Sequence, residues 1–293
     1  MPAYDEQTHY SFSQKWGSNP RLAFDLTQDE RSEFQKWILN RNGYKDKQAL
    51  ARELSKYQAI LDAGCGNGRV TALLASLAPR ARVVGVDVID LEIARSNTQR
   101  FPNIEYIHAD LTKDLTHLGK FDFIYCQEVL HHTGDPRGSF GNLVKILGER
   151  GKIEIYVYRK KAPAREFMDD YIRGQISSMN YEEAMKICRQ IADLGKRLSA
   201  IESEIQVDDM PVIGLVKGRY TVQRFIYNFF MKCYWRQSLS DHENAVINYD
   251  WYHPQNCSRH TMNEVLEWFR GEKLSVVWQF EDMYGIVVHG VKP

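Results

Sequence analysis

The segment ILDAGCGNGRV, residues 60–70, places an acidic side chain directly before three closely spaced glycines. Asp62 ends an apolar run, and the glycines that follow it are Gly64, Gly66 and Gly68. Glycines in such a loop let the backbone approach a ligand and let a helix begin close to the strand. A dinucleotide-binding loop has the pattern G-x-G-x-x-G. Because Arg69 stands where that pattern has its third glycine, the loop predicts a strand, a tight turn and a helix without clearly indicating NAD.

Two further strand-like runs lead into acidic side chains. The run RVVGVDV contains Asp87, followed by Val88, and an acid in this place can accept hydrogen bonds from both hydroxyls of a ribose. Asp90, three residues later, is better placed to cap the next helix. The run IEYIHAD ends at Asp110, which can accept a hydrogen bond from an amino group, and Leu111 beside it offers an apolar face to a flat ring.

A fourth run, FDFIYCQ, leads into the residues best suited to chemistry on a substrate. Gln127 ends this run, and Glu128, His131 and His132 follow it. Both histidines are candidates for a general base, and His132 is preferred as a pocket residue and as the catalytic candidate. Their spacing does not suit a metal ion, so we expect no metal site.

The pattern of the chain predicts the elements that bring these side chains together. Five short runs rich in Val, Ile, Tyr and Phe alternate with helical stretches over residues 58–158; they are QAILDAG, RVVGVDV, IEYIHAD, FDFIYCQ and KIEIYVY. This alternation predicts a parallel sheet with helices on both faces. Such sheets bind ligands beyond the C-terminal ends of their strands. The runs LSVVWQFED and YGIVVHGVKP predict two more strands, a hairpin-like edge that brings the total to seven.

The chain therefore divides into three parts. Residues 1–57 form an N-terminal helical segment, in which LTQDERSEFQKWILN predicts a helix with Thr27 as its N-cap. Residues 58–158 and 260–293 form the α/β core. Residues 159–259 form a mostly helical insertion between the fifth and sixth strands of the core. The insertion is expected to cover the substrate.

One helical stripe stands out in the insertion. In YEEAMKICRQIADLGKRLSAIESEI the apolar residues recur at spacings of three and four; they are Cys188, Ile191, Leu194, Leu198, Ile201 and Ile205. We expect a helix that packs on its own sheet. The alternative is the seam of a homodimer, although two heptads are short for a coiled coil.

The remainder of the insertion carries the candidates for substrate binding. GRYTVQRFIYNFFMKCYWRQ is unusually aromatic and predicts a core-packing helix. NYDWYHP mixes polar and aromatic residues before a proline and predicts a loop, and loops of this kind often line a site. The substrate candidates are Tyr220, Arg224, Asp250, Trp251, Tyr252 and Arg259, together with His132.

Composition excludes several classes of function. Lys and Arg together number 38, as do Asp and Glu, so the chain lacks the basic surplus of a nucleic-acid-binding protein. No stretch reaches the roughly 18 apolar residues of a membrane helix, and the start lacks the apolar core of a signal peptide. The five cysteines are scattered and form no C-x-x-C pair. We therefore expect a cytoplasmic protein without disulfides, nucleic acid or membrane as partners.

Taken together, LDAGCGNG, GVD, HADL and FDFIYCQEVLHH resemble the motif series of class I S-adenosylmethionine-dependent methyltransferases. They look most like the small-molecule subgroup with a VLHHT-DP motif, and the reversed last strand fits the same family. The resemblance covers about residues 58–158 and 260–293 and implies a Rossmann-like seven-stranded methyltransferase sheet. It departs from the family at LGERGK, where a Pro-Gly-Gly turn is usual.

The resemblance also implies a cofactor, S-adenosyl-L-methionine, and roles for the residues that match the family's motifs. Asp62 and the three glycines would line its methionine and ribose part, and Asp87 with Val88 would bind the ribose. Asp110 would hold the adenine amino group, with Leu111 beside the ring. Gln127 would face the sulfonium.

The expected function is methyl transfer to a small-molecule acceptor that is amino-acid-like or zwitterionic, at a thioether sulfur, an amine nitrogen or a hydroxyl oxygen. Aromatic rings can face a cation and an arginine can hold a carboxylate. Two other functions stay open: an NAD-binding dehydrogenase, and a non-catalytic regulator that binds S-adenosylmethionine.

Overall fold

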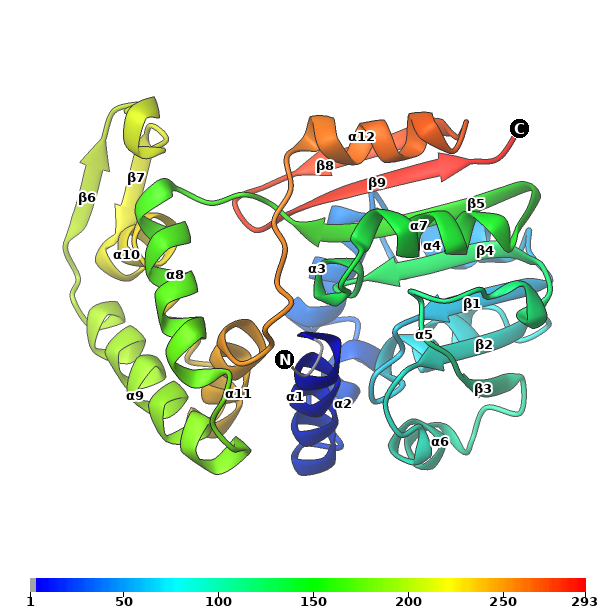
Figure 1. Ribbon diagram of the computed structural model, residues 1–293, viewed down its shortest axis with the longest axis horizontal. Coiled ribbons are helices and arrows are strands. Elements are labelled where there is room, and N and C mark those ends of the chain that lie inside the picture. Colours follow the sequence, from blue (N-terminus) through cyan, green and yellow to red (C-terminus); the bar gives the residue numbers. More distant parts are fainter. Residues whose placement is uncertain (1–3) are drawn as a thin grey trace. The chain divides into compact units, whose positions relative to one another are not determined.

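The computed structural model of the chain describes residues 4–293, which form two compact units (Figure 1). The sheet unit comprises Trp16–Arg159 and Ser258–Pro293. The insertion unit comprises residues 4–15 and Lys160–Cys257. The helix α1, Tyr4–Ser18, contributes residues to both units. No helix in the described part of the chain is both long enough and apolar enough to span a membrane.

The sheet unit is built on one mixed sheet of seven strands, in the order β3-β2-β1-β4-β5-β9-β8 (Figure 1). β1 to β5 pair in parallel, whereas β9 runs antiparallel to both β5 and β8. The strands are β1 Ala59–Ala63, β2 Arg82–Asp87, β3 Ile104–His108, β4 Phe121–Gln127, β5 Leu147–Tyr158, β8 Ser275–Glu281 and β9 Gly285–Val291. The predicted seven-stranded sheet with a reversed strand is confirmed.

Helices cover both faces of this sheet because neighbouring strand residues point to opposite sides. Ile60, Val83 and Phe123 pack against one set of helices, which are α3 Glu33–Arg41, α4 Lys47–Leu54 and α5 Arg69–Leu77. Leu61, Val84 and Ile124, one residue further along each strand, pack against the other set, which is α7 Pro136–Lys145 and α12 Met262–Gly271. The strands are therefore buried on both faces, as their nearly continuous apolar runs predict. The remaining helices of this unit are α2 Phe24–Gln28, α6 Glu92–Thr98, η1 Thr116–Leu118 and η2 Leu130–His132.

The N-terminal helical segment differs from its prediction at Thr27. The stretch predicted as one helix forms two, α2 and α3, and Thr27 lies inside α2. Its hydroxyl donates a hydrogen bond to the carbonyl of Ala23 at 2.8 Å. Ser32 caps α3 instead, because its hydroxyl accepts from the backbone N–H of Phe34.

The insertion unit is mostly helical, as predicted. Its helices and strands are α8 Pro163–Ile176, α9 Tyr181–Ser199, η3 Pro211–Ile213, α10 Val222–Phe229, α11 Asp241–Tyr252, and the two-stranded sheet of β6 Glu204–Val207 with β7 Gly218–Thr221. Capping boxes begin α9 at Asn180 and α11 at Ser240. These reciprocal hydrogen bonds satisfy backbone N–H groups that would otherwise lack partners at the helix start.

NYDWYHP is not the loop that its composition predicts, because α11 runs through its first five residues. Asn244 and Asn248 are fully buried within this helix. Their side-chain amides bond the backbone N–H and carbonyl groups of Arg236 and Tyr234, at 2.8–3.0 Å. These two asparagines thus tie a neighbouring segment to the helix, and the aromatic residues that follow Asn248 are buried; they are Tyr249, Trp251 and Tyr252.

The apolar stripe of α9 is confirmed only in part. Cys188 and Ile191 are buried, whereas Leu194 is 39% exposed, and the helix ends at Ser199 before the stripe does. The packed face is instead marked by small residues such as Gly195, where an added Cβ would lie 2.5 Å from the carbonyl oxygen of Cys233. Close approach of backbone, rather than leucine packing, therefore defines this face.

Candidate functional site

The glycine loop between β1 and α5 has a backbone that only glycine adopts readily. Gly64, Gly66 and Gly68 have φ values of 83°, 53° and 81°, in the region that L side chains rarely occupy. An added Cβ on Gly64 would lie 2.2 Å from a methyl of Val129, and one on Gly66 would lie 2.9 Å from the indole of Trp16. Two hydrogen bonds hold the loop against β2, because the N–H groups of Gly64 and Cys65 both donate to the carbonyl of Val86.

Asp62 lies at the start of this loop and is almost fully buried. The hydroxyl of Thr71, on α5, donates to its carboxylate at 2.6 Å. Burial raises the pKa of Asp62 to about 7, although the bond from Thr71 acts in the opposite direction. Near neutral pH, the neutral and the charged forms of the Asp62 carboxyl group are therefore both populated.

Asp87 lies at the C-terminal end of β2 and holds the same loop from the other side. Its Oδ2 accepts from the N–H of Gly66 at 2.8 Å, and its Oδ1 accepts from the N–H of Val88 at 2.8 Å. Oδ1 of Asp87 also accepts from the N–H of Ile89 at 3.3 Å, so the carboxylate joins the glycine loop to the turn after β2. Asp90 makes a different contact, accepting from the N–H of Glu92 at 3.0 Å in the first turn of α6.

Asp110 and Leu111 follow β3, next to the end of β2 in the sheet. The carboxylate of Asp110 accepts from both the N–H and the hydroxyl of Thr112, each at 2.8 Å, which fixes the turn. Leu111 is buried, and its carbonyl accepts from the side chain of Asn142 at 3.1 Å. A partly exposed carboxylate and an apolar side chain thus lie side by side in sequence at this strand end.

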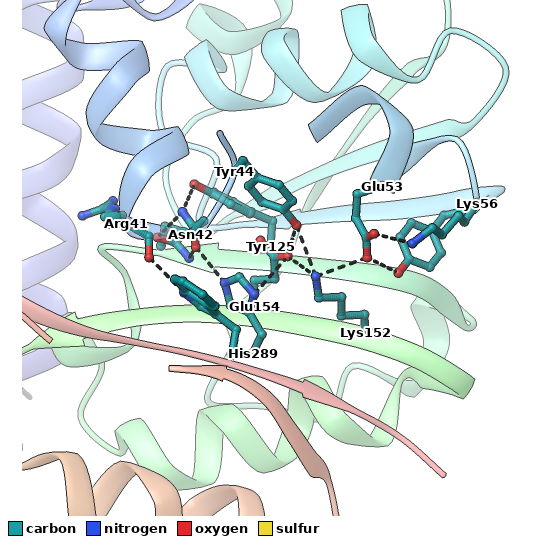
Figure 2. Close-up of polar contacts among 12 residues, drawn as sticks. Arg41, Asn42, Tyr44, Glu53, Lys56, Tyr125, Lys152, Glu154 and His289 are labelled. Atoms are coloured by element: carbon teal, nitrogen blue, oxygen red, sulfur yellow. Dashed lines mark hydrogen bonds and ion pairs between the residues drawn. The ribbon is translucent and has the colours of Figure 1, made fainter. Parts of the chain in front are cut away.

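Gln127 ends β4 and is held by residues from distant parts of the chain. Its side-chain N–H donates to Oδ1 of Asn42 at 3.0 Å, and the Asn42 side chain returns a longer bond of 3.4 Å. Nε2 of His289, on β9, donates to the same Asn42 oxygen at 3.0 Å. Figure 2 shows Asn42 and His289 facing each other next to Glu154. The position of Gln127 therefore depends on a buried polar network.

This network continues along β5 towards the surface (Figure 2). Nδ1 of His289 lies 3.4 Å from the carboxylate of Glu154, which accepts from Lys152 at 2.8 Å and from the hydroxyl of Tyr44. Lys152 also reaches Glu53 at 3.2 Å. Burial and the charge of Lys152 hold the pKa of His289 well below its usual range, so the ring is neutral.

His131 and His132 lie in η2 directly after β4, and both are buried. The ring of Tyr158, at the end of β5, lies with its centroid 3.6 Å from that of His131 and 5.5 Å from that of His132. The backbone carbonyl of His131 accepts from the N–H of Ser258 at 2.8 Å. The two histidines are thus packed against aromatic residues at the strand ends that carry the other site candidates.

The substrate candidates are divided between the two units. Arg259 belongs to the sheet unit, while the remaining insertion candidates belong to the insertion unit. Trp251 and Tyr252 are buried on α11, and the hydroxyl of Tyr252 donates to Asp169 at 2.8 Å. Asp250 is ion-paired with Lys15 at 2.5 Å.

Tyr220 and Arg224 lie at the β7–α10 junction, where both are half-buried. The hydroxyl of Tyr220 donates to the carbonyl of Val216 at 2.9 Å, and the Arg224 guanidinium lies 5.1 Å from the ring centroid of Tyr227. Both side chains therefore have contacts within the insertion unit.

Sequence reasoning missed four residues that shape the sheet-unit site: Trp16, Asn42, Val129 and His289. Trp16 and Val129 lie against the glycine loop, Asn42 bonds Gln127, and His289 bonds Asn42. No local pattern marks them, because their roles arise only when the strands pair. The structure also describes no group of three or more His, Cys, Asp or Glu side chains that could hold a metal, in the residues it covers.

These strand ends fit an adenosine-type cofactor on structural grounds. The strand order places the ends of β3, β2, β1 and β4 next to one another. Their acidic side chains are of the kind that could accept hydrogen bonds from ribose hydroxyls and an amino group, and the glycine loop has a backbone without side chains for close approach. This is the donor and acceptor pattern that a nucleoside with a charged tail requires.

Comparison with known proteins relates the sheet unit to methyltransferases. Residues 61–155 match the family described as "Methyltransferase domain". The chain is 32% identical over 113 residues to trans-aconitate 2-methyltransferase of Deinococcus radiodurans. This match covers 39% of this chain and 42% of that protein. It is 30% identical over 160 residues to trans-aconitate 2-methyltransferase of Azoarcus sp., which covers 54% of this chain and 52% of that protein.

The fold is also found in a solved structure. PKMT2 from Rickettsia typhi resembles the chain with a TM-score of 0.52 and 14% sequence identity, over 83% of this chain and 53% of that one. The chain spans about a third to a half of the length of the curated relatives it matches. The likeness identifies the Rossmann-like methyltransferase fold.

Proposed function

We propose that the protein is an S-adenosylmethionine-dependent methyltransferase that acts on a small-molecule acceptor. One observation carries this proposal. In a sheet with the methyltransferase strand order, four adjacent strand ends carry Asp62 with its glycine loop, Asp87, Asp110 and Gln127. The match of residues 61–155 to the methyltransferase domain family supports the same reading.

Each side chain then has a role that its surroundings support. Asp87 accepts from the ribose hydroxyls while its bond to the N–H of Gly66 keeps the loop in place. Asp110 accepts from the adenine amino group, and Leu111 packs beside the ring. The glycine loop leaves space for the methionine part, and Asp62 in its charged form favours the methionine ammonium. The cofactor supplies an electrophilic methyl group on its sulfonium.

The remaining task of the protein is to align the acceptor with that methyl group. Methyl transfer is an in-line displacement, and correct alignment provides a large part of the rate. The network behind Gln127 serves this alignment, because Asn42 and His289 fix the side chain that would face the sulfonium. A base is required only if the acceptor arrives protonated, and His132 is the candidate for that role.

The insertion unit and the relatives support a proposal for the acceptor class. The insertion unit carries arginines beside an aromatic ring, Arg165 and Arg224 next to Tyr227. Two of the relatives are named for a methyl acceptor with carboxyl groups, trans-aconitate. We propose an amino-acid-like or carboxylate-bearing acceptor that is methylated at sulfur, nitrogen or oxygen.

A turnover screen tests the function. The purified chain is incubated with S-adenosylmethionine and a panel of amino acids, thioethers, amines, phenols and carboxylic acids, and S-adenosylhomocysteine is quantified. We expect release that depends on one acceptor class. Binding of S-adenosylmethionine without turnover on any acceptor would favour the non-catalytic regulator. Tight binding of NAD in place of S-adenosylmethionine would favour the dehydrogenase.

A further inference from the structure

A cluster of cations surrounds one indole ring inside the insertion unit. Lys161, Arg165, Arg173 and Lys232 each carry a charge 5.0–5.8 Å from the ring centroid of Trp251. Trp251 is 3% exposed, and Arg165 is 1% exposed. Charged side chains are seldom buried unless they are paired. A cation of this cluster that has no acidic partner is therefore a candidate for binding an anionic ligand.

The neighbouring aspartates are already engaged. Asp169 pairs with Arg165 at 3.1 Å, Asp170 pairs with Arg173, and Asp250 pairs with Lys15 at 2.5 Å. The carboxylate of Asp169 also accepts from the Trp251 indole, from the Tyr252 hydroxyl and from the backbone N–H of Lys232, which brings its donors to four. Four donors fill the lone pairs of a carboxylate, so Asp169 has no acceptor site left for another cation.

Nη1 of Arg165 is therefore a buried donor without an acceptor among the described residues, and the ammonium of Lys232 lies near the same Trp251 ring. Nη1 of Arg165 is buried and has no hydrogen-bond partner in the described part of the chain. Lys232 is 6% exposed, its ammonium lies 5.0 Å from the Trp251 ring centroid, and this ammonium has no hydrogen bond or ion pair within residues 4–293. Burial lowers the pKa of Lys232 to about 8, against the opposing charge of Asp250. Lys232 is thus mostly charged at neutral pH.

We propose that Arg165 and Lys232 bind a carboxylate group of the acceptor, a proposal that rests on the methyltransferase function above. The Lys232 ammonium forms no ion pair with an aspartate of the described residues, although the charges of Asp250 and Asp169 raise its pKa against the effect of burial, and one carboxylate would supply such a partner. Arg165 and Lys232 offer one free donor each at least, and a carboxylate has two oxygens to accept them. Hydrogen bonds between charged partners in a buried place are the strong ones.

The surroundings of the two donors add to this assignment. The Arg165 guanidinium lies 4.6 Å from the ring centroid of Tyr227, and both Tyr227 and Trp251 are buried. Aromatic rings next to the donors favour a ligand with an apolar or flat body beside its carboxylate. Asp169, bonded on both oxygens, fixes Arg165 and Trp251 in place.

The test uses Lys232→Met, which keeps the length of the side chain and removes its charge. A lysine that has only a structural role would stabilise the fold, so its loss would lower the melting temperature. A buried lysine that serves to bind a ligand destabilises the ligand-free fold, because its charge is removed from water without a partner. Lys232→Met should therefore melt at the wild-type temperature or above it. Lys186→Met is the matched control, because Lys186 lies exposed on α9 of the same unit.

Binding is measured by calorimetry with a panel of probes: acetate, benzoate, methionine and trans-aconitate, each beside its amide, together with methyl phosphate. We expect at least one carboxylate to bind the wild type and its amide to bind far more weakly. Lys232→Met should weaken the carboxylate roughly ten- to a hundredfold. Lys232→Arg should restore most of the affinity, and Lys186→Met should leave it unchanged.

Three results would overturn the assignment. They are the absence of binding by every carboxylate, equal binding by carboxylate and amide, or binding of methyl phosphate alone. S-adenosylhomocysteine is titrated into the same preparations. If S-adenosylhomocysteine binds the wild type and no carboxylate does, the carboxylate site is refuted and the methyltransferase function is not. If S-adenosylhomocysteine itself does not bind the wild type, that result counts against the methyltransferase function.

Discussion

Lys152→Met should destabilise the sheet unit strongly. Lys152 lies 2.8 Å from the carboxylate of Glu154, and Glu154 is fully buried with its second oxygen unbonded. Burial alone would lower the pKa of Lys152, but the charges of Glu154 and Glu53 outweigh it and raise that pKa. Within residues 4–293, methionine would leave Glu154 with the hydroxyl of Tyr44 and the neutral ring of His289, neither of which carries a positive charge. Removing one partner of a buried ion pair costs about 3–5 kcal/mol.

The assay is thermal unfolding at pH 7 of Lys152→Met beside Lys56→Met. At about 2–4 °C per kcal/mol, the first variant should melt roughly 6–20 °C below the wild type. Lys56 bonds Glu53 at the surface, where it is 61% exposed, so its variant should lose at most about 1 kcal/mol. The difference in melting temperature between the two variants should become smaller at low pH, because a protonated Glu154 is neutral and needs no cation beside it. Equal melting temperatures at pH 7 would refute the role of the buried pair.

Three further predictions concern the loop and the insertion. Gly66→Val should abolish S-adenosylmethionine binding in calorimetry, because φ is 53° and the new side chain would meet Trp16; normal binding would place the loop elsewhere. Asp62 has a pKa near 7 in the folded state and 3.8 as its ordinary value, so the folded form keeps a proton that the unfolded form loses. The free energy of unfolding should therefore fall by about 4 kcal/mol between pH 4 and pH 7, and denaturant titrations should find this fall missing in Asp62→Asn. Tyr252→Phe should lower the melting temperature, because its hydroxyl bonds Asp169 and the Lys232 carbonyl, while S-adenosylmethionine affinity stays within about threefold; lower turnover or a higher KM at an unchanged melting temperature would instead favour a direct substrate contact.

The sheet and the glycine loop could be predicted because their signals are local. Alternating apolar runs and helices fix a parallel sheet, and the position of each polar residue after a strand fixes the edge at which it lies. The sequence alone therefore suffices to place Asp62, Asp87, Asp110 and Gln127 at the ends of four strands of one parallel sheet, while the strand order in the structure makes these ends neighbours.

The features that could not be predicted depend on tertiary contacts. The helix through NYDWYHP is stabilised by a capping box eight residues earlier and by asparagines that bond another segment. Gln127 is held by Asn42 and His289, which lie 85 and 162 residues away in the sequence. The cations around Trp251 come from Lys161 just before α8, from α8 itself, and from the segment between α10 and α11. None of these partners follows from spacing along the chain.

The central claim is tested most directly by the affinity of Asp87→Ala for S-adenosylmethionine, measured by isothermal titration calorimetry. Loss of a charged acceptor for two ribose hydroxyls should cost roughly 1.5–3 kcal/mol and weaken binding at least about tenfold. Asp90→Ala is the control, because Asp90 follows the same strand but accepts only within the first turn of α6. Its affinity should match that of the wild type. Equal affinities in folded Asp87→Ala and wild type, or no binding by the wild type, would contradict the cofactor site and the function proposed from it.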